Sequence, residues 1–129
     1  MTAIPVISIV DDDASMRAGL DNLVRSLGYI ACTFDSAEAF LQSVELHNTW
    51  CIVADVRMPG MSGVQMQSHL RKLAYRIPFI FITAAPEETA RRRALDDGAI
   101  CFLTKPFDDE TLIECLDTAI EQHRRGIDA

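Results

Sequence analysis

At residues 6–13 the chain reads VISIVDDD, a mostly apolar run that ends in three carboxylates. Similar short apolar runs recur at 29–34, 51–54, 79–82 and 100–103. Near-continuous runs of this length, rich in Ile, Val and Phe, are typical of strands that are buried on both faces of a parallel sheet. The sequence therefore predicts five parallel strands covered by helices.

In the segments between these runs, apolar residues recur at the spacing of an α-helix. The fourth such segment, from Pro86 to Asp97, has the smallest apolar face, so we expect it to be the most mobile helix. Strands that alternate with helices predict the α/β class, as a doubly wound five-stranded parallel sheet with five helices. The apolar residues of the other four helices are Met16, Leu20, Leu23, Val24 and Leu27; Ala37, Phe40, Leu41 and Val44, after a cap at Ser36; Val64, Met66, Leu70 and Leu73; and Leu112, Ile113, Leu116, Ala119 and Ile120.

The length of 129 residues fits one domain, which we expect to span residues 1–122, with 123–129 as a C-terminal tail or the start of a linker. A formal net charge of -7 argues against binding of nucleic acid or of an anionic membrane surface by this domain. The start of the chain does not resemble a signal peptide, and no apolar stretch approaches the roughly 18 residues of a membrane span. These features favour a cytoplasmic location.

The four cysteines are Cys32, Cys51, Cys101 and Cys115. They form no C-x-x-C pair and no cluster with histidine, which argues against a zinc site. All four lie among apolar neighbours in the sequence. We therefore expect buried, reduced thiols rather than disulfides.

Polar residues follow the apolar runs where each predicted strand ends. The first run is followed by the carboxylates 11–13, the third by Asp55, the fourth by Thr83 and the fifth by Thr104 and Lys105. The carboxyl ends of parallel strands meet at one edge of the sheet, so these side chains should converge there. Carboxylates packed together need a cation, and ligands that are all oxygen favour Mg²⁺. Asp13 has a second interpretation, as the cap of the helix that follows.

Asp55 is the candidate nucleophile of this cluster. A lone carboxylate at a strand end, beside a metal site, can attack phosphorus and form an aspartyl phosphate. Lys105 would then balance one phosphoryl oxygen, and the Thr83 hydroxyl would donate a hydrogen bond to another. A glycine-rich phosphate loop is absent from the sequence, so nucleotide binding is not indicated.

Four motifs together resemble the receiver domain of two-component response regulators. They are Val10-Asp11-Asp12-Asp13, Asp55-Val56-Arg57-Met58-Pro59-Gly60, Thr83-Ala84 and Lys105-Pro106-Phe107. The resemblance runs from about Val6 to Ile120 and is strongest to the receivers of FixJ-type transcription regulators. It implies the flavodoxin-like form of the predicted sheet. In that subfamily a helix-turn-helix domain follows the receiver, so the chain is either a single-domain receiver or a part of a longer regulator.

The resemblance also implies roles for the metal and phosphoryl sites. Asp11 and Asp12 look like the acidic pair that holds Mg²⁺. Asp55 looks like the phosphoacceptor and would place one oxygen on the metal, while Arg57 would offer its backbone carbonyl. The phosphodonor would be a partner histidine kinase.

A second group of residues resembles the family's switch. Thr83 matches the switch hydroxyl, Lys105 the phosphoryl-binding cation and Phe102 the switch aromatic. The peptide bond between Lys105 and Pro106 is expected to be cis. We expect phosphorylation to strengthen a weak homodimer through the fourth helix and the fifth strand.

Two other functions compete with this interpretation. One is a small Mg²⁺-dependent phosphohydrolase with an aspartyl nucleophile. That class needs a second Asp two residues after the nucleophile, where this sequence has Arg57. The other is a receiver that only binds partners, against which the complete set of acidic, hydroxyl and ammonium groups argues.

Overall fold

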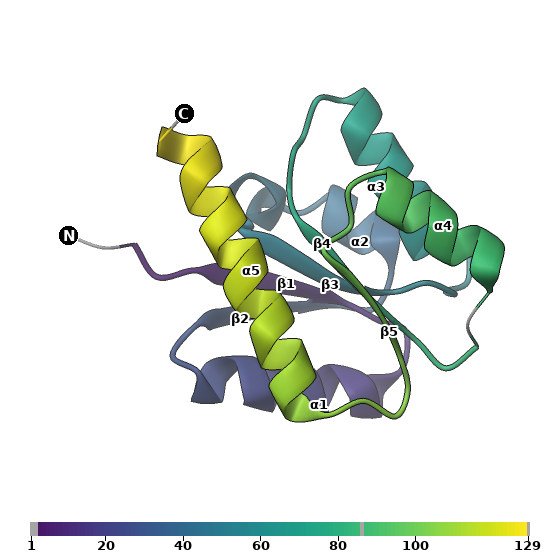
Figure 1. Ribbon diagram of the computed structural model, residues 1–129, viewed down its shortest axis with the longest axis horizontal. Coiled ribbons are helices and arrows are strands. Elements are labelled where there is room, and N and C mark those ends of the chain that lie inside the picture. The colour runs from purple at the N-terminus through teal and green to yellow at the C-terminus, as the bar shows by residue number, and fades with distance from the viewer. Residues whose placement is uncertain (1–2, 86, 129) are drawn as a thin grey trace.

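In the computed structural model, which describes residues 3–85 and 87–128, helices cover both faces of a five-stranded parallel sheet (Figure 1). The strand order is β2-β1-β3-β4-β5, and every neighbouring pair is parallel. This confirms the predicted α/β class and the doubly wound sheet. The strands are β1 (Val6–Val10), β2 (Ile30–Phe34), β3 (Cys51–Asp55), β4 (Phe79–Thr83) and β5 (Cys101–Thr104).

The helices divide between the two faces of the sheet. Helices α1 and α5 pack on one face, and α2, α3 and α4 pack on the other (Figure 1). Side chains alternate along a strand, so Ile7 and Ile9 of β1 enter the α1–α5 core while Ile52 and Ala54 of β3 enter the opposite core. The helices are α1 (Ala14–Ser26), α2 (Ala37–Leu41), α3 (Gly63–Lys72), α4 (Glu88–Asp96) and α5 (Asp109–Asp128), with a 3₁₀ helix η1 (Val44–Asn48) after α2.

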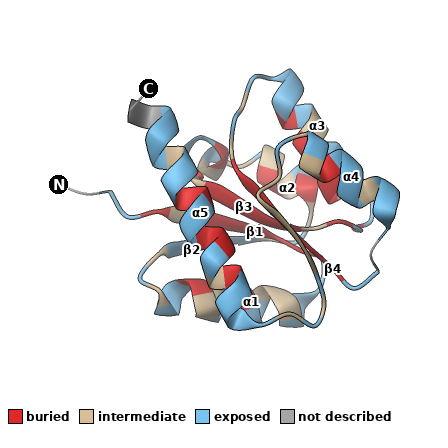
Figure 2. Cartoon of the chain, viewed as in Figure 1, coloured by how far each residue is buried: buried red, intermediate tan, exposed pale blue. Residues whose placement is uncertain are grey.

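Burial follows this layering. The central strands are buried along their length, whereas the outer sides of the helices are exposed (Figure 2). Within the described residues, no helix has both the length and the apolar character needed to cross a bilayer.

The start of α3 is built to approach the end of β3. Ser62 accepts a hydrogen bond from the amide of Gln65, whose side chain accepts one from the amide of Ser62, and this capping box satisfies two N–H groups of the first turn. Gly63 follows, and a Cβ at this position would collide with the carbonyl oxygen of Asp55. Glycine therefore lets the helix begin directly beside the strand end that carries Asp55.

Two expected helices differ at their ends. The second stops at Leu41, and Val44 is 76% exposed rather than part of its apolar face. Ser43 accepts a hydrogen bond from the amide of Glu45 and starts the 3₁₀ helix, which breaks the α-helical period. The fourth helix begins at Glu88, and the expected start at Pro86 lies outside the described residues. Ala94 is the buried residue of α4, so its apolar face is as thin as the sequence indicated.

The expectation of four reduced cysteines is wrong for one pair. Cys101 of β5 and Cys115 of α5 form a disulfide, with Cα atoms 6.3 Å apart. Cys32 and Cys51 are free, and burial raises the pKa of the Cys51 thiol. The pairing depends on how α5 lies across β5, which the spacing of cysteines in the sequence does not reveal.

The C-terminal end of α5 packs on Trp50, the residue before β3. The ring of His123 stacks on Trp50 with centroids 4.5 Å apart, and the guanidinium of Arg124 lies 5.7 Å from the Trp50 ring centroid. Burial lowers the pKa of His123. The helix continues to Asp128, so the domain boundary that we expected at residue 122 does not coincide with a helix end.

Candidate functional site: a carboxylate cluster at the sheet edge

Three carboxylates meet where β1 and β3 end. These strands are hydrogen-bonded neighbours in the centre of the sheet, so Asp11 and Asp12 come beside Asp55. One carboxylate oxygen from each residue lies within 4.8 Å of the other two. Asp11 is buried, Asp12 is exposed and the Asp55 side chain is 13% exposed. Solvent therefore reaches the cluster at the exposed Asp12.

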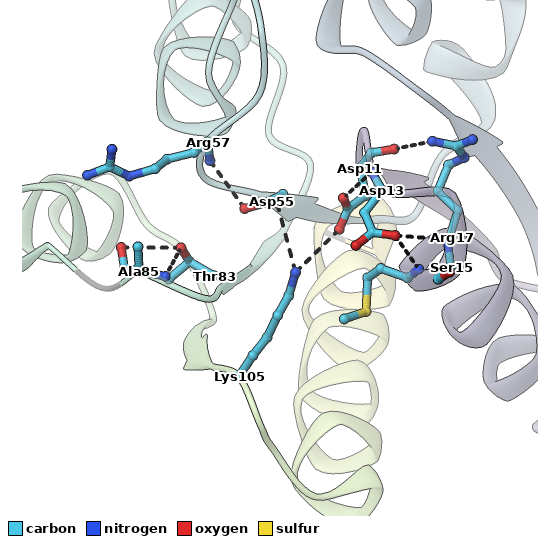
Figure 3. A network of polar contacts seen from close by, with 10 residues as sticks. Asp11, Asp13, Ser15, Arg17, Asp55, Arg57, Thr83, Ala85 and Lys105 are labelled. Atoms are coloured by element: carbon cyan, nitrogen blue, oxygen red, sulfur yellow. Dashed lines mark hydrogen bonds and ion pairs between the residues drawn. The ribbon is translucent and has the colours of Figure 1, made fainter.

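Hydrogen bonds orient the two inner carboxylates (Figure 3). Asp11 accepts from the amide of Asp13 at 2.9 Å, and its backbone carbonyl accepts from the Arg17 guanidinium at 2.7 Å. Asp55 accepts from the amide of Arg57 at 3.2 Å. The ammonium of Lys105 lies 3.9 Å from a carboxylate oxygen of Asp11 and 3.9 Å from one of Asp55. The Lys105 ammonium thus faces both carboxylates but is within hydrogen-bond distance of neither.

The electrostatics of the cluster leave negative charge in excess. Burial raises the pKa of both Asp11 and Asp55, and backbone amides and the Lys105 ammonium oppose that rise without cancelling it. Asp12 raises the pKa of Asp55 further by repulsion. Three carboxylates beside one ammonium call for a further cation, and a donor set of carboxylate oxygens fits a hard divalent metal ion. The cluster can therefore hold a metal.

Asp13 belongs to the helix and not to this cluster. Its side chain accepts hydrogen bonds from the amides of Ser15 at 2.8 Å and of Met16 at 3.2 Å, so it caps α1. This decides between the two interpretations that the sequence left open.

The switch candidates lie on β4 and β5. Thr83 is 1% exposed at the end of β4, and its hydroxyl accepts from the amide of Ala85 at 3.2 Å (Figure 3). Phe102 is partly buried and pairs in register with Phe81, with ring centroids 6.1 Å apart. It lies two residues before Thr104, the strand partner of Thr83. Phe102 is therefore outside the carboxylate cluster.

Lys105 continues directly from β5 toward the cluster. Its amide donates to the carbonyl oxygen of Thr83 at 2.9 Å, which ties the ends of β4 and β5 together. The Lys105–Pro106 peptide bond is cis, the geometry that the resemblance implied.

Sequence reasoning missed an ion pair that spans two loops at this edge. The guanidinium of Arg57, in the loop after β3, pairs with the carboxylate of Glu87, in the loop after β4. Both side chains are more than half exposed. A signal was available, because opposite charges follow two strands that the topology makes neighbours. Whether such charges meet depends on the conformation of the two loops, and the sequence pattern does not reveal that conformation.

A second missed contact holds the loop between β3 and α3. The carboxylate of Glu38, on α2, accepts from the amide of Met61 at 3.0 Å, and this hydrogen bond lowers the pKa of Glu38. The loop that follows Asp55 is therefore tied to a second helix.

The comparisons with known proteins agree with this geometry. A family model described as the response regulator receiver domain matches residues 7–117. The chain is 42% identical over 124 residues to nodulation protein W of Bradyrhizobium diazoefficiens, covering 96% of this chain and 55% of that protein. It is 35% identical over 122 residues to the transcriptional regulatory protein FixJ of the same organism, covering 95% and 60%.

A solved structure gives the same result in three dimensions. The structure of response regulator StyR superposes with a TM-score of 0.87 and 39% sequence identity, over 98% of this chain and 64% of that one. The chain spans about half the length of the curated relatives that it matches.

Proposed function

The chain belongs to the response regulator receiver family, and from this premise we propose that Asp55 accepts a phosphoryl group from a histidine kinase in the presence of Mg²⁺. Receivers of this family work in two-component signalling and interact with histidine kinases. One observation carries the assignment of Asp55. It is the largely buried carboxylate at the end of the central strand β3, with two acidic neighbours and the Lys105 ammonium 3.9 Å away.

Mg²⁺ would be held by the carboxylates of Asp11, Asp12 and Asp55 and by the backbone carbonyl of Arg57. When bound, it would offset the repulsion among the carboxylates and the incoming phosphoryl oxygens. The three carboxylates repel one another because one oxygen from each lies within 4.8 Å of the other two. Asp11, the most buried of the three, is held in place by the amide of Asp13.

The transfer step is a displacement at phosphorus. A carboxylate oxygen of Asp55 forms a P–O bond while the P–N bond to the kinase histidine breaks, and the imidazole leaves with the electron pair. The Lys105 ammonium would bind one phosphoryl oxygen, and the Thr83 hydroxyl would donate to another after leaving Ala85. Hydrolysis by water later returns Asp55 to its free form. The domain would thus catalyse only its own phosphorylation and dephosphorylation.

The output would pass through α4 and β5. Movement of the Thr83 hydroxyl pulls on the loop that leads into α4, and Phe102 on β5 would repack beside it. The surface of α4 and β5 would then favour a homodimer that is weak without phosphorylation. A phosphoryl group shifts this equilibrium only by its different affinity for the two states, about 1–3 kcal/mol.

The remaining assignments form part of the same proposal. Residues 1–122 would make the receiver, and 123–129, into which α5 continues as far as Asp128, would be a tail or the start of a linker, in a cytoplasmic protein of transcription regulation. The net charge of -7 argues against nucleic-acid binding by this domain itself. The phosphohydrolase alternative is not favoured, because Arg57 stands where that class needs an acid. Binding without phosphorylation is not favoured, because the cluster is complete.

Intact-mass measurement after incubation with acetyl phosphate or phosphoramidate tests the phosphoacceptor. With Mg²⁺ we expect the mass of one added phosphoryl group, lost in Asp55→Asn and in EDTA. The control is Asp13→Asn, which removes a neighbouring carboxylate that caps α1 but lies outside the cluster. Label that persists in Asp55→Asn, or that forms fully in EDTA, would overturn the assignment.

A further inference from the structure

The ion pair between Arg57 and Glu87 directs a cation away from the phosphoacceptor. The backbone amide of Arg57 donates to Asp55, whereas its side chain extends in the opposite direction, toward the loop before α4 (Figure 3). Glu87, which lies four residues after Thr83, receives that guanidinium. A permanent positive charge two residues from a cluster of three carboxylates is thus paired elsewhere.

The surrounding charges make this arrangement unexpected. Within the part of the chain that the structure describes, the ammonium of Lys105 is the one paired with this cluster, 3.9 Å from Asp11 and 3.9 Å from Asp55. Arginine stays protonated at every physiological pH and binds carboxylates and phosphates through two parallel N–H groups. Without a competing partner, the Arg57 guanidinium would be attracted to the cluster, and more strongly to a phosphoryl group on Asp55.

We propose that Glu87 is a positioning residue that holds the Arg57 guanidinium away from the phosphoryl site and thereby slows phosphorylation of Asp55. This inference rests on the proposed function. When Glu87 loses its charge, Arg57 is free to bind the incoming phosphoryl oxygens and to stabilise the charge of the transition state. Glu87 thereby limits how readily small anionic donors phosphorylate the domain in the absence of a kinase.

The size of the effect is bounded by the strength of the pair. Both side chains are more than half exposed, and an exposed ion pair contributes at most about 1 kcal/mol, which is about a fivefold change in an equilibrium. The gain in phosphorylation rate from releasing Arg57 cannot exceed the free energy that the ion pair contributes. We therefore expect a rate increase of about two- to fivefold at low salt, which fades near 1 M salt, where the screening length is about 3 Å.

The neighbouring residue supplies a matched control. Glu88 is also exposed but pairs with Arg91 within α4, with 3.5 Å between guanidinium nitrogen and carboxylate oxygen. Glu87→Gln and Glu88→Gln remove the same charge one residue apart, but only the first releases Arg57. A general change in the electrostatic field of the domain would alter the phosphorylation rate of both variants alike.

The experiment measures the rate of phosphorylation by acetyl phosphate with Mg²⁺ in wild type, Glu87→Gln, Glu88→Gln, Arg57→Ala and the Arg57→Ala/Glu87→Gln double variant. We expect acceleration in Glu87→Gln, the wild-type rate in Glu88→Gln, and no difference between Arg57→Ala and the double variant. Equal rates in the two Gln variants, or acceleration that persists without Arg57, would overturn the inference. If the wild type itself takes no label, the proposed function fails instead.

A spectroscopic signature separates positioning from a merely structural role. The Arg57 Nε–H resonance in ¹⁵N spectra, identified by its loss in Arg57→Ala, reports the partner of the guanidinium. We expect it to move further on addition of beryllofluoride and Mg²⁺ in Glu87→Gln than in wild type or Glu88→Gln. An unchanged Arg57 resonance in beryllofluoride-bound Glu87→Gln would also overturn the inference.

Discussion

Helices α5 and α4 flank the last strand of the same sheet but are attached to it in different ways. Helix α5 inserts a row of apolar side chains into the core, is joined to β5 by a disulfide and stacks His123 on Trp50. Helix α4 buries Ala94 and is held to α3 mainly by polar contacts. Those contacts run from Gln67 to Ala94 and Asp97, from Ser68 to Asp97 and Arg93, and from Arg71 to Asp97.

This contrast indicates where the fold can change shape. Moving α5 would expose apolar area at about 25 cal/mol per Å² and leave cavities in the core. Moving α4 would exchange hydrogen bonds and exposed ion pairs for water, which costs little in free energy. The carboxylate edge connects to α4 through Thr83 and through the pair of Arg57 with Glu87. We therefore expect changes of shape on the side of α4, while the side of α5 contributes more to stability.

The largest effect should come from truncating one leucine in each helix. Leu116 of α5 is fully buried, so Leu116→Ala should lower the free energy of unfolding by about 3 kcal/mol through lost burial and a cavity. Leu95 of α4 is only partly buried, so Leu95→Ala should cost about 1 kcal/mol. Urea denaturation of both variants measures the contrast. Equal losses would show that α4 is anchored as firmly as α5.

Reduction of the disulfide should have the next largest effect. Cys101 and Cys115 are 14 residues apart, and closing a loop of this length contributes about 3 kcal/mol in the chain-entropy model. We expect dithiothreitol, or Cys101→Ser/Cys115→Ser, to lower the free energy of unfolding by about 2–3 kcal/mol. The matched control is Cys32→Ser, which removes a free thiol. A count of four free thiols in denaturant without reductant would contradict the pairing.

The smallest effect, and one of opposite sign, is expected at the carboxylate edge. Burial raises the pKa of Asp55, so the folded state favours its protonated form. Its stabilising contribution is present at acidic pH and is lost as the pH rises through that raised pKa. At pH 7 without divalent cations, Asp55→Asn should therefore raise the free energy of unfolding, by about 1 kcal/mol.

Denaturation in EDTA at pH 7 and at pH 4 measures this gain, which should shrink at the lower pH. Mg²⁺ should then stabilise the wild type more than Asp55→Asn. A variant that is less stable than wild type at pH 7 would show that the edge is not under electrostatic repulsion.

Local patterns in the sequence determined the sheet and the residues at its edge. Runs such as VISIV identify strands because burial on both faces requires apolar residues in succession, and this signal needs no knowledge of neighbouring segments. Asp55 and Thr83 are the last residues of their strands, and Asp11 and Lys105 follow directly after theirs. The carboxyl ends of parallel strands lie at one edge of the sheet, so the convergence of these side chains was predictable as well.

Contacts between side chains from distant segments depend on how the elements pack and could not be predicted from local patterns. The Cys101–Cys115 disulfide depends on where α5 crosses β5, and the Arg57–Glu87 pair depends on two loop conformations. Asp13 had two possible roles until the geometry of the first turn of α1 assigned it to the cap. Apolar periodicity records which face of an element is buried. The contacts between elements depend on register, crossing position and loop path, and these are properties of the packed chain as a whole.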